Sequence, residues 1–254
     1  MFKGVLKEQA VQVGIGFVLI VVLLGTFILP EWMSNNFMYG LSRGLAVLGL
    51  MILWRTNLVS FGHALFYGFG AYAVAIAQKY LGITDIFLRV IIAIVAAGLL
   101  GFVLGFILRK YREIFFAMLS LAFSMVLYGL LAKAEFLGST DGMSISPSTI
   151  FGLELGRFGL FYFIGFIVIL SLIFAHCYLR SSLGHLTTAI SDNEIRVEYL
   201  GYSVEKAIHI KYVISACLAG GAGGLMAASL GQVDPDSMVL WSVSGELVFV
   251  TIMA

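Results

Sequence analysis

Hydrophobic residues along the chain gather into long runs that are separated by short polar stretches. In runs such as 90–108 the residues are apolar in every direction, whereas strands of a membrane barrel alternate polar and apolar residues. A helix needs roughly 20 mostly apolar residues to cross a bilayer core about 30 Å thick. The pattern therefore predicts an all-α, polytopic helical membrane protein. About eight spans are expected, at 12–29, 37–54, 61–79, 86–108, 115–132, 158–179, 207–230 and 239–254.

Composition and charge support a membrane protein and limit its domain number and its partners. Hydrophobic residues make up 61% of the 254 positions and charged residues 11%, which is far from the balance of a soluble domain. No polar stretch is long enough to link two folded domains, so we expect a single transmembrane domain over 1–254. The last run reaches Ala254 with no polar tail, so we expect the chain to be truncated or its final span to be completed by other residues. A net charge of +1 gives no reason to expect a nucleic-acid partner.

Basic residues are distributed unequally between the connections. If the N-terminus is cytoplasmic, more Lys and Arg fall on the cytoplasmic side than outside, as the positive-inside rule requires. The cytoplasmic set is Lys3, Lys7, Arg55, Arg109, Lys110, Arg112, Arg180, Arg196 and Lys206, and the outer set is Lys79, Arg89, Lys133 and Arg157. We therefore expect a cytoplasmic N-terminus.

Glycines recur four residues apart inside three of the runs, at Gly40 and Gly44, Gly101 and Gly105, and Gly220 and Gly224. Small residues at this spacing let helix backbones approach closely within a membrane, so we expect helix packing there. In the run 66–72, glycines alternate with aromatic residues, a pattern that suits close packing and a substrate pathway equally.

The longest informative polar stretch is 180–206. Leu183, Leu186, Ile190, Val197 and Leu200 recur at helical spacing, which predicts two short amphipathic helices. Ser191 and Glu194 have the spacing of a capping box, and Gly201 suits the left-handed end of a helix, so the second helix is expected over about 192–200. Such a segment could lie on the membrane or enter a groove of a soluble partner, and its acidic residues favour the partner.

Several motifs resemble one family of transporters. The run 58–72, LVSFGHALFYGFGAY, resembles the SxGHAxFxGxGAY signature of branched-chain amino acid ABC permeases of the LivM type. The run 137–144, LGSTDGMS, resembles the external loop of these permeases, and 119–123 resembles the stretch that precedes it. Ser182 to His185 and 189–201 resemble the loop that contacts the ATP-hydrolysing subunit, so the resemblance covers nearly all of the chain from about Gly40 onward.

The resemblance implies the permease fold of an ATP-driven ABC importer in the inner membrane. ABC ATPase subunits, a second permease subunit and an extracytoplasmic binding protein are the implied partners, with ATP bound by the ATPase. The expected substrate pathway comprises Asn57, Ser60, Phe61, Gly62, His63, Phe66 and Tyr67, and the expected external loop comprises Ser139, Thr140, Asp141 and Gly142. The expected coupling residues are Gly184, Ile190, Asp192, Asn193, Glu194, Glu198, Leu200 and Gly201.

The substrate is less narrowly indicated than the transporter class. Where the family has a Gly-Tyr-Ala-Gly turn before its signature, this chain has Trp54-Arg55-Thr56-Asn57. Branched-chain or related amino acids are the first expectation, and urea, short amides or aromatic acids are the alternative. Asp141 could receive the binding protein or cap a turn with Gly142.

The sequence disfavours an enzyme. It contains no P-loop, so ATP hydrolysis is expected on a separate chain, and no cofactor or metal is expected on this one. His176 and His209 are expected as interior residues, whereas His63 could line the pathway or cap its helix. The alternative of another class is an ion-coupled secondary transporter or channel, which needs charged groups near the bilayer midplane. Glu246 could be such an interior group or an interfacial one.

Overall fold

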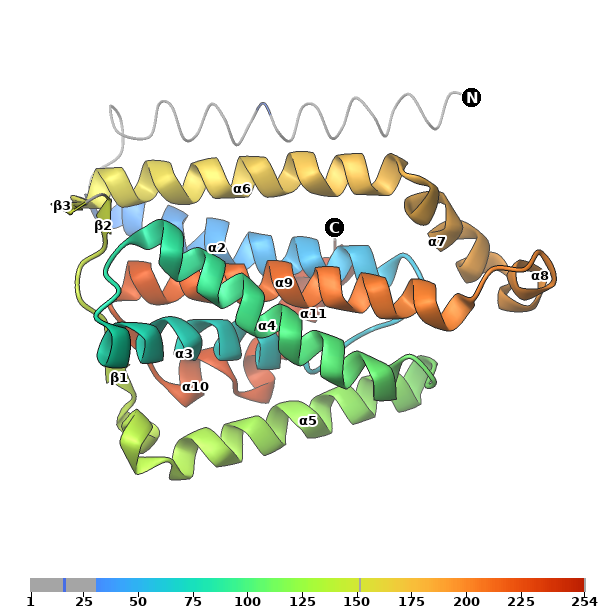
Figure 1. Ribbon diagram of the computed structural model, residues 1–254, viewed down its shortest axis with the longest axis horizontal. Coiled ribbons are helices and arrows are strands. Elements are labelled where there is room, and N and C mark those ends of the chain that lie inside the picture. The colour runs from blue at the N-terminus through green and yellow to red at the C-terminus, as the bar shows by residue number, and fades with distance from the viewer. Residues whose placement is uncertain (1–15, 17–30, 151, 254) are drawn as a thin grey trace.

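The computed structural model describes residues 16, 31–150 and 152–253. Long helices run side by side and form an elongated bundle (Figure 1). A short strand region lies at one end of the bundle and two short helices project from the other end (Figure 1). The long helices are α2 (Glu31–Trp54), α3 (His63–Leu81), α4 (Ile86–Leu108), α5 (Glu113–Lys133), α6 (Arg157–Arg180), α9 (Val204–Leu230) and α11 (Trp241–Met253).

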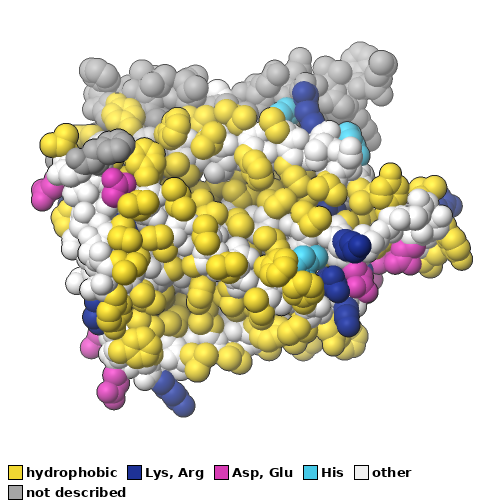
Figure 2. Space-filling model, viewed as in Figure 1, with side chains coloured by type: hydrophobic (Ala, Val, Ile, Leu, Met, Phe, Trp, Pro, Cys, Tyr) yellow, Lys and Arg dark blue, Asp and Glu magenta, His cyan; other side chains and the backbone are white. Residues whose placement is uncertain are grey.

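Six helical segments among the described residues are long and apolar enough to cross a membrane. They are Met33–Trp54, Ile86–Leu108, Glu113–Lys133, Arg157–Arg180, Val204–Leu230 and Pro235–Met253. Hydrophobic side chains form a belt around the middle of the visible face, with charged side chains gathered toward its ends (Figure 2). The chain is therefore a polytopic helical membrane protein, as predicted.

The described residues contain six of the about eight expected spans. The run 12–29 lies outside the described residues. The run 61–79 does form a helix, α3, but this helix does not reach the apolarity of a span. Most of its residues are buried against neighbouring helices, so α3 needs little lipid-compatible surface.

Helix α9 lies at the centre of the bundle and packs against α2, α3 and α4 (Figure 1). Its glycines allow this approach: a Cβ at Gly220 would lie 2.1 Å from the Cβ of Ala97, and a Cβ at Gly223 would lie 1.8 Å from the backbone oxygen of Tyr67. Packing predicted from Gly101, Gly105, Gly220 and Gly224 is thus confirmed. At Gly40 and Gly44 an added Cβ would meet no atom of the described residues within 4 Å, so the predicted packing is not formed within this part of the chain.

The strand end of the bundle is built from the connections between helices. Strand β1 (Met143–Ser144) pairs antiparallel with β4 (Gln232–Val233), and β2 (Thr149–Ile150) pairs with β3 (Leu153–Glu154). Two 3-10 turns, η1 (Glu135–Leu137) and η2 (Ser139–Asp141), precede β1, and the short helix α10 (Pro235–Met238) follows β4.

Arg89 holds this end together from inside. Its side chain is fully buried and donates to the backbone oxygens of Ile83 and Ser146 and to the side chains of Ser148 and Gln78, at 2.9–3.1 Å. A buried guanidinium must find acceptors, and here they come from α3, the α3–α4 turn and the loop after β1. Arg89 therefore joins three parts of the chain.

Candidate coupling site and translocation region

Two short helices, α7 (Ser182–Asp192) and α8 (Glu194–Tyr199), project beyond the ends of the long helices (Figure 1). Helix α7 begins where Ser181 ends α6, and the Ser181 hydroxyl accepts a hydrogen bond from the Gly184 amide at 3.3 Å. A Cβ at Gly184 would lie 2.3 Å from the backbone oxygen of Leu179, so only glycine fits this corner. The predicted coupling residue Gly184 thus sets the direction in which α7 leaves α6.

The start of α8 differs from the predicted capping box. Ser191 lies inside α7, and the cap is Asn193, whose Oδ1 accepts from the Arg196 amide at 3.1 Å. The Glu194 carboxylate is turned away toward Arg112, so it cannot return to the Ser191 amide as a capping box requires. Helix α8 is therefore shorter than the expected 192–200.

The end of α8 follows the prediction. Gly201 has φ +86°, and its amide donates to the Glu198 oxygen at 2.9 Å while the Tyr202 amide donates to the Val197 oxygen at 3.3 Å. These two bonds form a Schellman motif, which needs a left-handed residue at this position. Glycine takes that conformation without strain.

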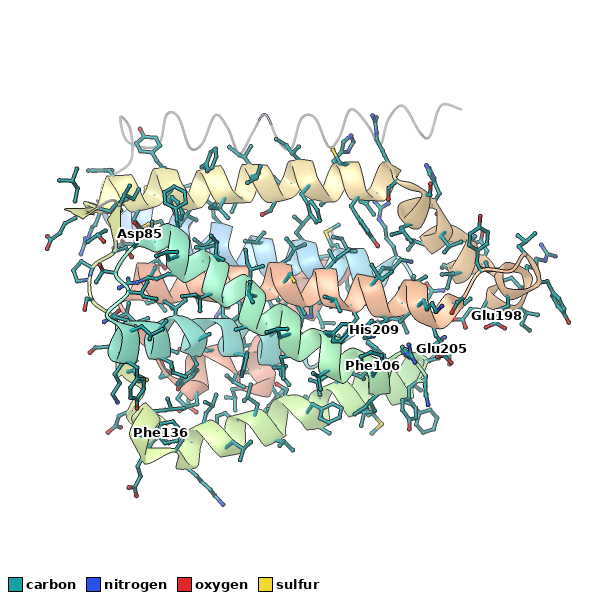
Figure 3. All side chains as sticks on the ribbon, viewed as in Figure 1. Asp85, Phe106, Phe136, Glu198, Glu205 and His209 are labelled. Atoms are coloured by element: carbon teal, nitrogen blue, oxygen red, sulfur yellow. The ribbon has the colours of Figure 1, made fainter. Side chains whose placement is uncertain are left out.

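The segment of the two short helices buries some of its apolar side chains and exposes others. Ile190 and Val197 are buried, whereas the predicted apolar residue Leu200 points outward. Exposed apolar residues form what we call the α8 tip: Ile195, Tyr199, Leu200 and Tyr202, with 64%, 88%, 75% and 57% of their surface exposed. Asp192 and Glu198 are exposed beside it, and Figure 3 shows Glu198 on the projecting segment. An exposed apolar tip of this kind fits a groove in a partner protein.

Two polar contacts join the short helices to the bundle. The Arg112 Nε donates to both carboxylate oxygens of Glu194, at 2.8 and 3.0 Å, and Asn57 Nδ2 donates to the Ser191 oxygen at 3.4 Å. Arg112 lies in the α4–α5 connection and Asn57 in the α2–α3 connection. These residues border a polar hollow of about 290 Å³ whose floor includes Ile190 and Asn193. A displacement of α8 would therefore act on the α4–α5 connection through Glu194, and a displacement of α7 would act on the α2–α3 connection through Ser191.

Asn57 was predicted in the substrate pathway and Glu194 in the coupling segment, that is, in different sites. Arg112 was predicted only as one of the cytoplasmic basic residues. The one local signal for Arg112 was its position among charged residues between two spans. Its partner is 82 residues away, so spacing could not reveal the pair.

Most of the residues expected in the substrate pathway are packed inside the chain. Ser60, His63, Phe66 and Tyr67 are buried. Gly62 is buried as well, and a Cβ there would lie 2.0 Å from the Ser120 oxygen. Asn57 and Phe61 are exposed near the α7–α8 end. The seven residues therefore do not share one surface.

His63 and Phe66 belong to a cluster where α2, α3 and α9 meet. The His63 Nε2 lies 3.4 Å from the Ser215 hydroxyl, which donates to the Gly49 oxygen at 2.6 Å. The Phe66 ring packs edge-on against Tyr212, with centroids 5.3 Å apart. This arrangement links the loop near Asn57 to the centre of the bundle through α3.

The residues expected in the external loop lie at the opposite end. Ser139, Thr140 and Asp141 form η2, and Thr140 and Asp141 are exposed. Gly142 has φ +74°, and a Cβ there would lie 2.1 Å from the Val233 oxygen. Figure 3 shows Phe136 near this loop and Asp85 at the same end, far from Glu198. The predicted loop and coupling residues thus mark the two ends of the molecule.

A family described as branched-chain amino acid transport system / permease component matches residues 32–254. The chain belongs to this permease family. The matched residues include the α8 tip and the Arg112–Glu194 pair at one end of the bundle, the loop with Asp141 and Gly142 at the other end, and the long helices between them. Family membership and the apolar helices make the chain a multi-pass membrane protein of a transport system.

Curated relatives agree with this family. The high-affinity branched-chain amino acid transport system permease protein LivM of Escherichia coli K12 is 32% identical over 220 residues, which cover 75% of this chain and 52% of that protein. LivM of Salmonella typhimurium LT2 is 31% identical with the same coverage. The probable permease protein LivH of Methanocaldococcus jannaschii is 25% identical over 221 residues, covering 83% of this chain and 67% of that protein. The chain spans about half the length of the two LivM relatives. No solved structure matches the chain.

Proposed function

We propose that this chain is the membrane-spanning permease subunit of an ATP-driven importer for branched-chain or related amino acids. The observation that carries the proposal is the projecting α7–α8 pair, which ends in an exposed apolar tip and is hydrogen-bonded to two helix connections. The relatives are described as permeases of branched-chain amino acid transport systems. Because the chain lacks a P-loop, the energy comes from ATP bound and hydrolysed by a separate ATPase subunit.

In this proposal the α8 tip enters a groove of the ATPase subunit. ATP binding moves α8, and Glu194 transmits the movement through Arg112 to the α4–α5 connection. Helix α7 moves with α8, and its Ser191 transmits the movement through Asn57 to the connection that leads into α3 and His63. A shift of these helices between two arrangements opens the path to one side of the membrane at a time.

The orientation proposed for the importer follows from the basic residues at one end of the bundle. Arg55, Arg109, Arg112, Arg180 and Arg196 lie at the α7–α8 end, which the positive-inside rule places in the cytoplasm. This orientation agrees with a cytoplasmic N-terminus in the inner membrane. The strand end, with Asp141 and Gly142, then faces an extracytoplasmic binding protein, and a second permease subunit completes the path.

The experiment is an uptake assay with the complete transporter reconstituted in proteoliposomes. We expect radiolabelled leucine to accumulate only when ATP is supplied at the ATPase side, and unlabelled valine and isoleucine to compete. Competition by urea, amides or aromatic acids alone would move the substrate to the alternative class within the family. Accumulation that needs a proton or sodium gradient and no ATP would contradict the proposal and favour an ion-coupled transporter.

A further inference from the structure

The exposed face of α2 differs in chemistry from the exposed faces of α4, α5 and α6. Those three helices present many large apolar side chains, as lipid requires. Among the described residues of α2, Tyr39 is the only exposed large hydrophobic residue. Asn36, Gly40 and Gly44 occupy the rest of this face, at spacings of three or four residues.

A pair of opposite charges lies on this face. Arg43 of α2 donates through Nη1 to the Glu246 carboxylate of α11, which is 203 residues away. The side chains are 23% and 57% exposed, and the Tyr39 ring lies 4.4 Å from the Arg43 guanidinium carbon. Gly40 and Gly44 flank Arg43 on α2 and Gly245 precedes Glu246 on α11, and an added Cβ at any of them would meet no atom of the described residues within 4 Å. The pair is therefore open to a ligand.

The position of the pair near the middle of two candidate spans argues against a lipid-facing site. Arg43 lies at the centre of the span Met33–Trp54, and Glu246 is held at the same depth by their contact. Charged side chains at the bilayer midplane face a protein interior or a water-filled space, because exposure to hydrocarbon is costly. The α2–α11 face therefore borders a polar space.

We propose that the Arg43–Glu246 pair is a binding station for a zwitterionic α-amino acid on its way through the membrane. Arg43 takes the carboxylate of the amino acid through its planar guanidinium, and Glu246 takes the ammonium group. This inference rests on the proposed import of amino acids.

Because the site pairs a cation with an anion, its ligand must carry both a positive and a negative group. Opening the ion pair removes the mutual attraction of Arg43 and Glu246 and leaves each charge without its partner. A zwitterion replaces the Arg43–Glu246 contact with two new ion pairs, so no charge is left uncompensated. An amine or a carboxylic acid alone would satisfy only one of the two residues. The open glycines leave room beside the pair for the side chain of the ligand.

The test uses the complete transporter in proteoliposomes with saturating binding protein and radiolabelled leucine. We expect Arg43→Gln and Glu246→Gln each to lower the maximal ATP-driven uptake rate at least tenfold. The matched control is the pair Arg109–Glu205, whose atoms lie 3.4 Å apart and whose side chains are 24% and 47% exposed. Glu205→Gln should retain uptake within twofold.

Exchanging the two charges distinguishes a ligand-binding role of the pair from a structural role in holding α2 against α11. The double variant Arg43→Glu with Glu246→Arg preserves the attraction between the helices but reverses the field that the amino acid meets. We expect it to match the wild type in thermal stability while uptake stays at least tenfold reduced. Recovery of uptake in the swapped variant, or unchanged uptake in both single variants, would overturn the inference. Failure of the wild-type transporter to import any solute with ATP would instead count against the proposed function.

The polar space itself is tested by thiol labelling of the same transporter with Cys177 and Cys217 replaced by serine. A membrane-impermeant charged thiol reagent should modify Gly40→Cys at least tenfold faster than Val95→Cys, which lies on the exposed apolar face of α4. Equal rates at the two positions would contradict a water-accessible α2–α11 face.

Discussion

The Nε of Arg112 faces the carboxylate of Glu194 and lies 2.8 and 3.0 Å from its two oxygens. A second nitrogen of the same guanidinium donates to the Tyr111 oxygen at 3.0 Å, which holds the side chain in the α4–α5 connection. One side chain therefore binds the projecting helix and the bundle together. The pair is a direct side-chain link from α8 to the start of α5.

The left-handed residue at the end of α8 controls how the α8 tip is presented. Replacing Gly201, at φ +86°, by Val forces a branched residue into a left-handed conformation, which costs about 1–2 kcal/mol. We expect Gly201→Val to lower ATP-driven uptake several-fold while the chain still reaches the membrane. Gly201→Asn is the control, because asparagine tolerates this conformation, and it should retain most of the uptake. Equal activity of the two variants would show that the turn is unimportant.

Buried Arg89 should matter for stability rather than for coupling. Arg89→Leu removes the Arg89 donor from Ser148 and from two backbone oxygens, and one of the two donors from Gln78 Oε1; each unsatisfied buried group costs about 1–3 kcal/mol. We expect a clear fall in the unfolding temperature in detergent and faster proteolysis of the loop 143–150. Lys133→Leu changes an exposed cation at the end of α5 and should leave both measurements near wild type. Wild-type stability of Arg89→Leu would refute the role of Arg89 in holding this end together.

Close contact between α3 and α9 depends on Gly223. In Gly223→Ala the new Cβ would lie 1.8 Å from the Tyr67 backbone oxygen, so the helices must separate. Overpacking of this kind costs about 1–3 kcal/mol, and we expect a lower unfolding temperature. Gly129→Ala in α5 meets nothing within 4 Å and should be neutral or slightly stabilising. Equal stability of the two variants would show that α3 and α9 can move apart freely.

Hydrophobic pattern was sufficient to place the helices. The expected run 86–108 has the bounds of α4, and 115–132, 158–179 and 207–230 fall within α5, α6 and α9. Runs of apolar residues locate spans well because every residue facing lipid must be apolar. The same reasoning overcounted at α3, which is surrounded by protein and needs fewer apolar residues.

Local sequence was a poorer guide to side-chain partners. Ser191 and Glu194 had the spacing of a capping box, but Glu194 binds Arg112, and Asn193 caps α8 instead. Gly201 was predicted correctly because a left-handed helix end depends only on its immediate neighbours. The pairs Arg112–Glu194 and Arg43–Glu246 join residues 82 and 203 positions apart, so only the packing of the helices brings them together. The long-range contacts of the coupling site and of the α2–α11 face therefore required the structure.

The most direct measurement of the proposed coupling is the number of leucine molecules imported for each ATP hydrolysed, determined in the same proteoliposomes. In Glu194→Gln the link to Arg112 is weakened, which for a partly exposed ion pair costs about 1 kcal/mol or less. We expect ATP hydrolysis to continue while the import ratio falls several-fold, whereas Glu205→Gln keeps the wild-type ratio. An unchanged ratio in Glu194→Gln would contradict the account that α8 transmits the energy of ATP to the permease through Arg112.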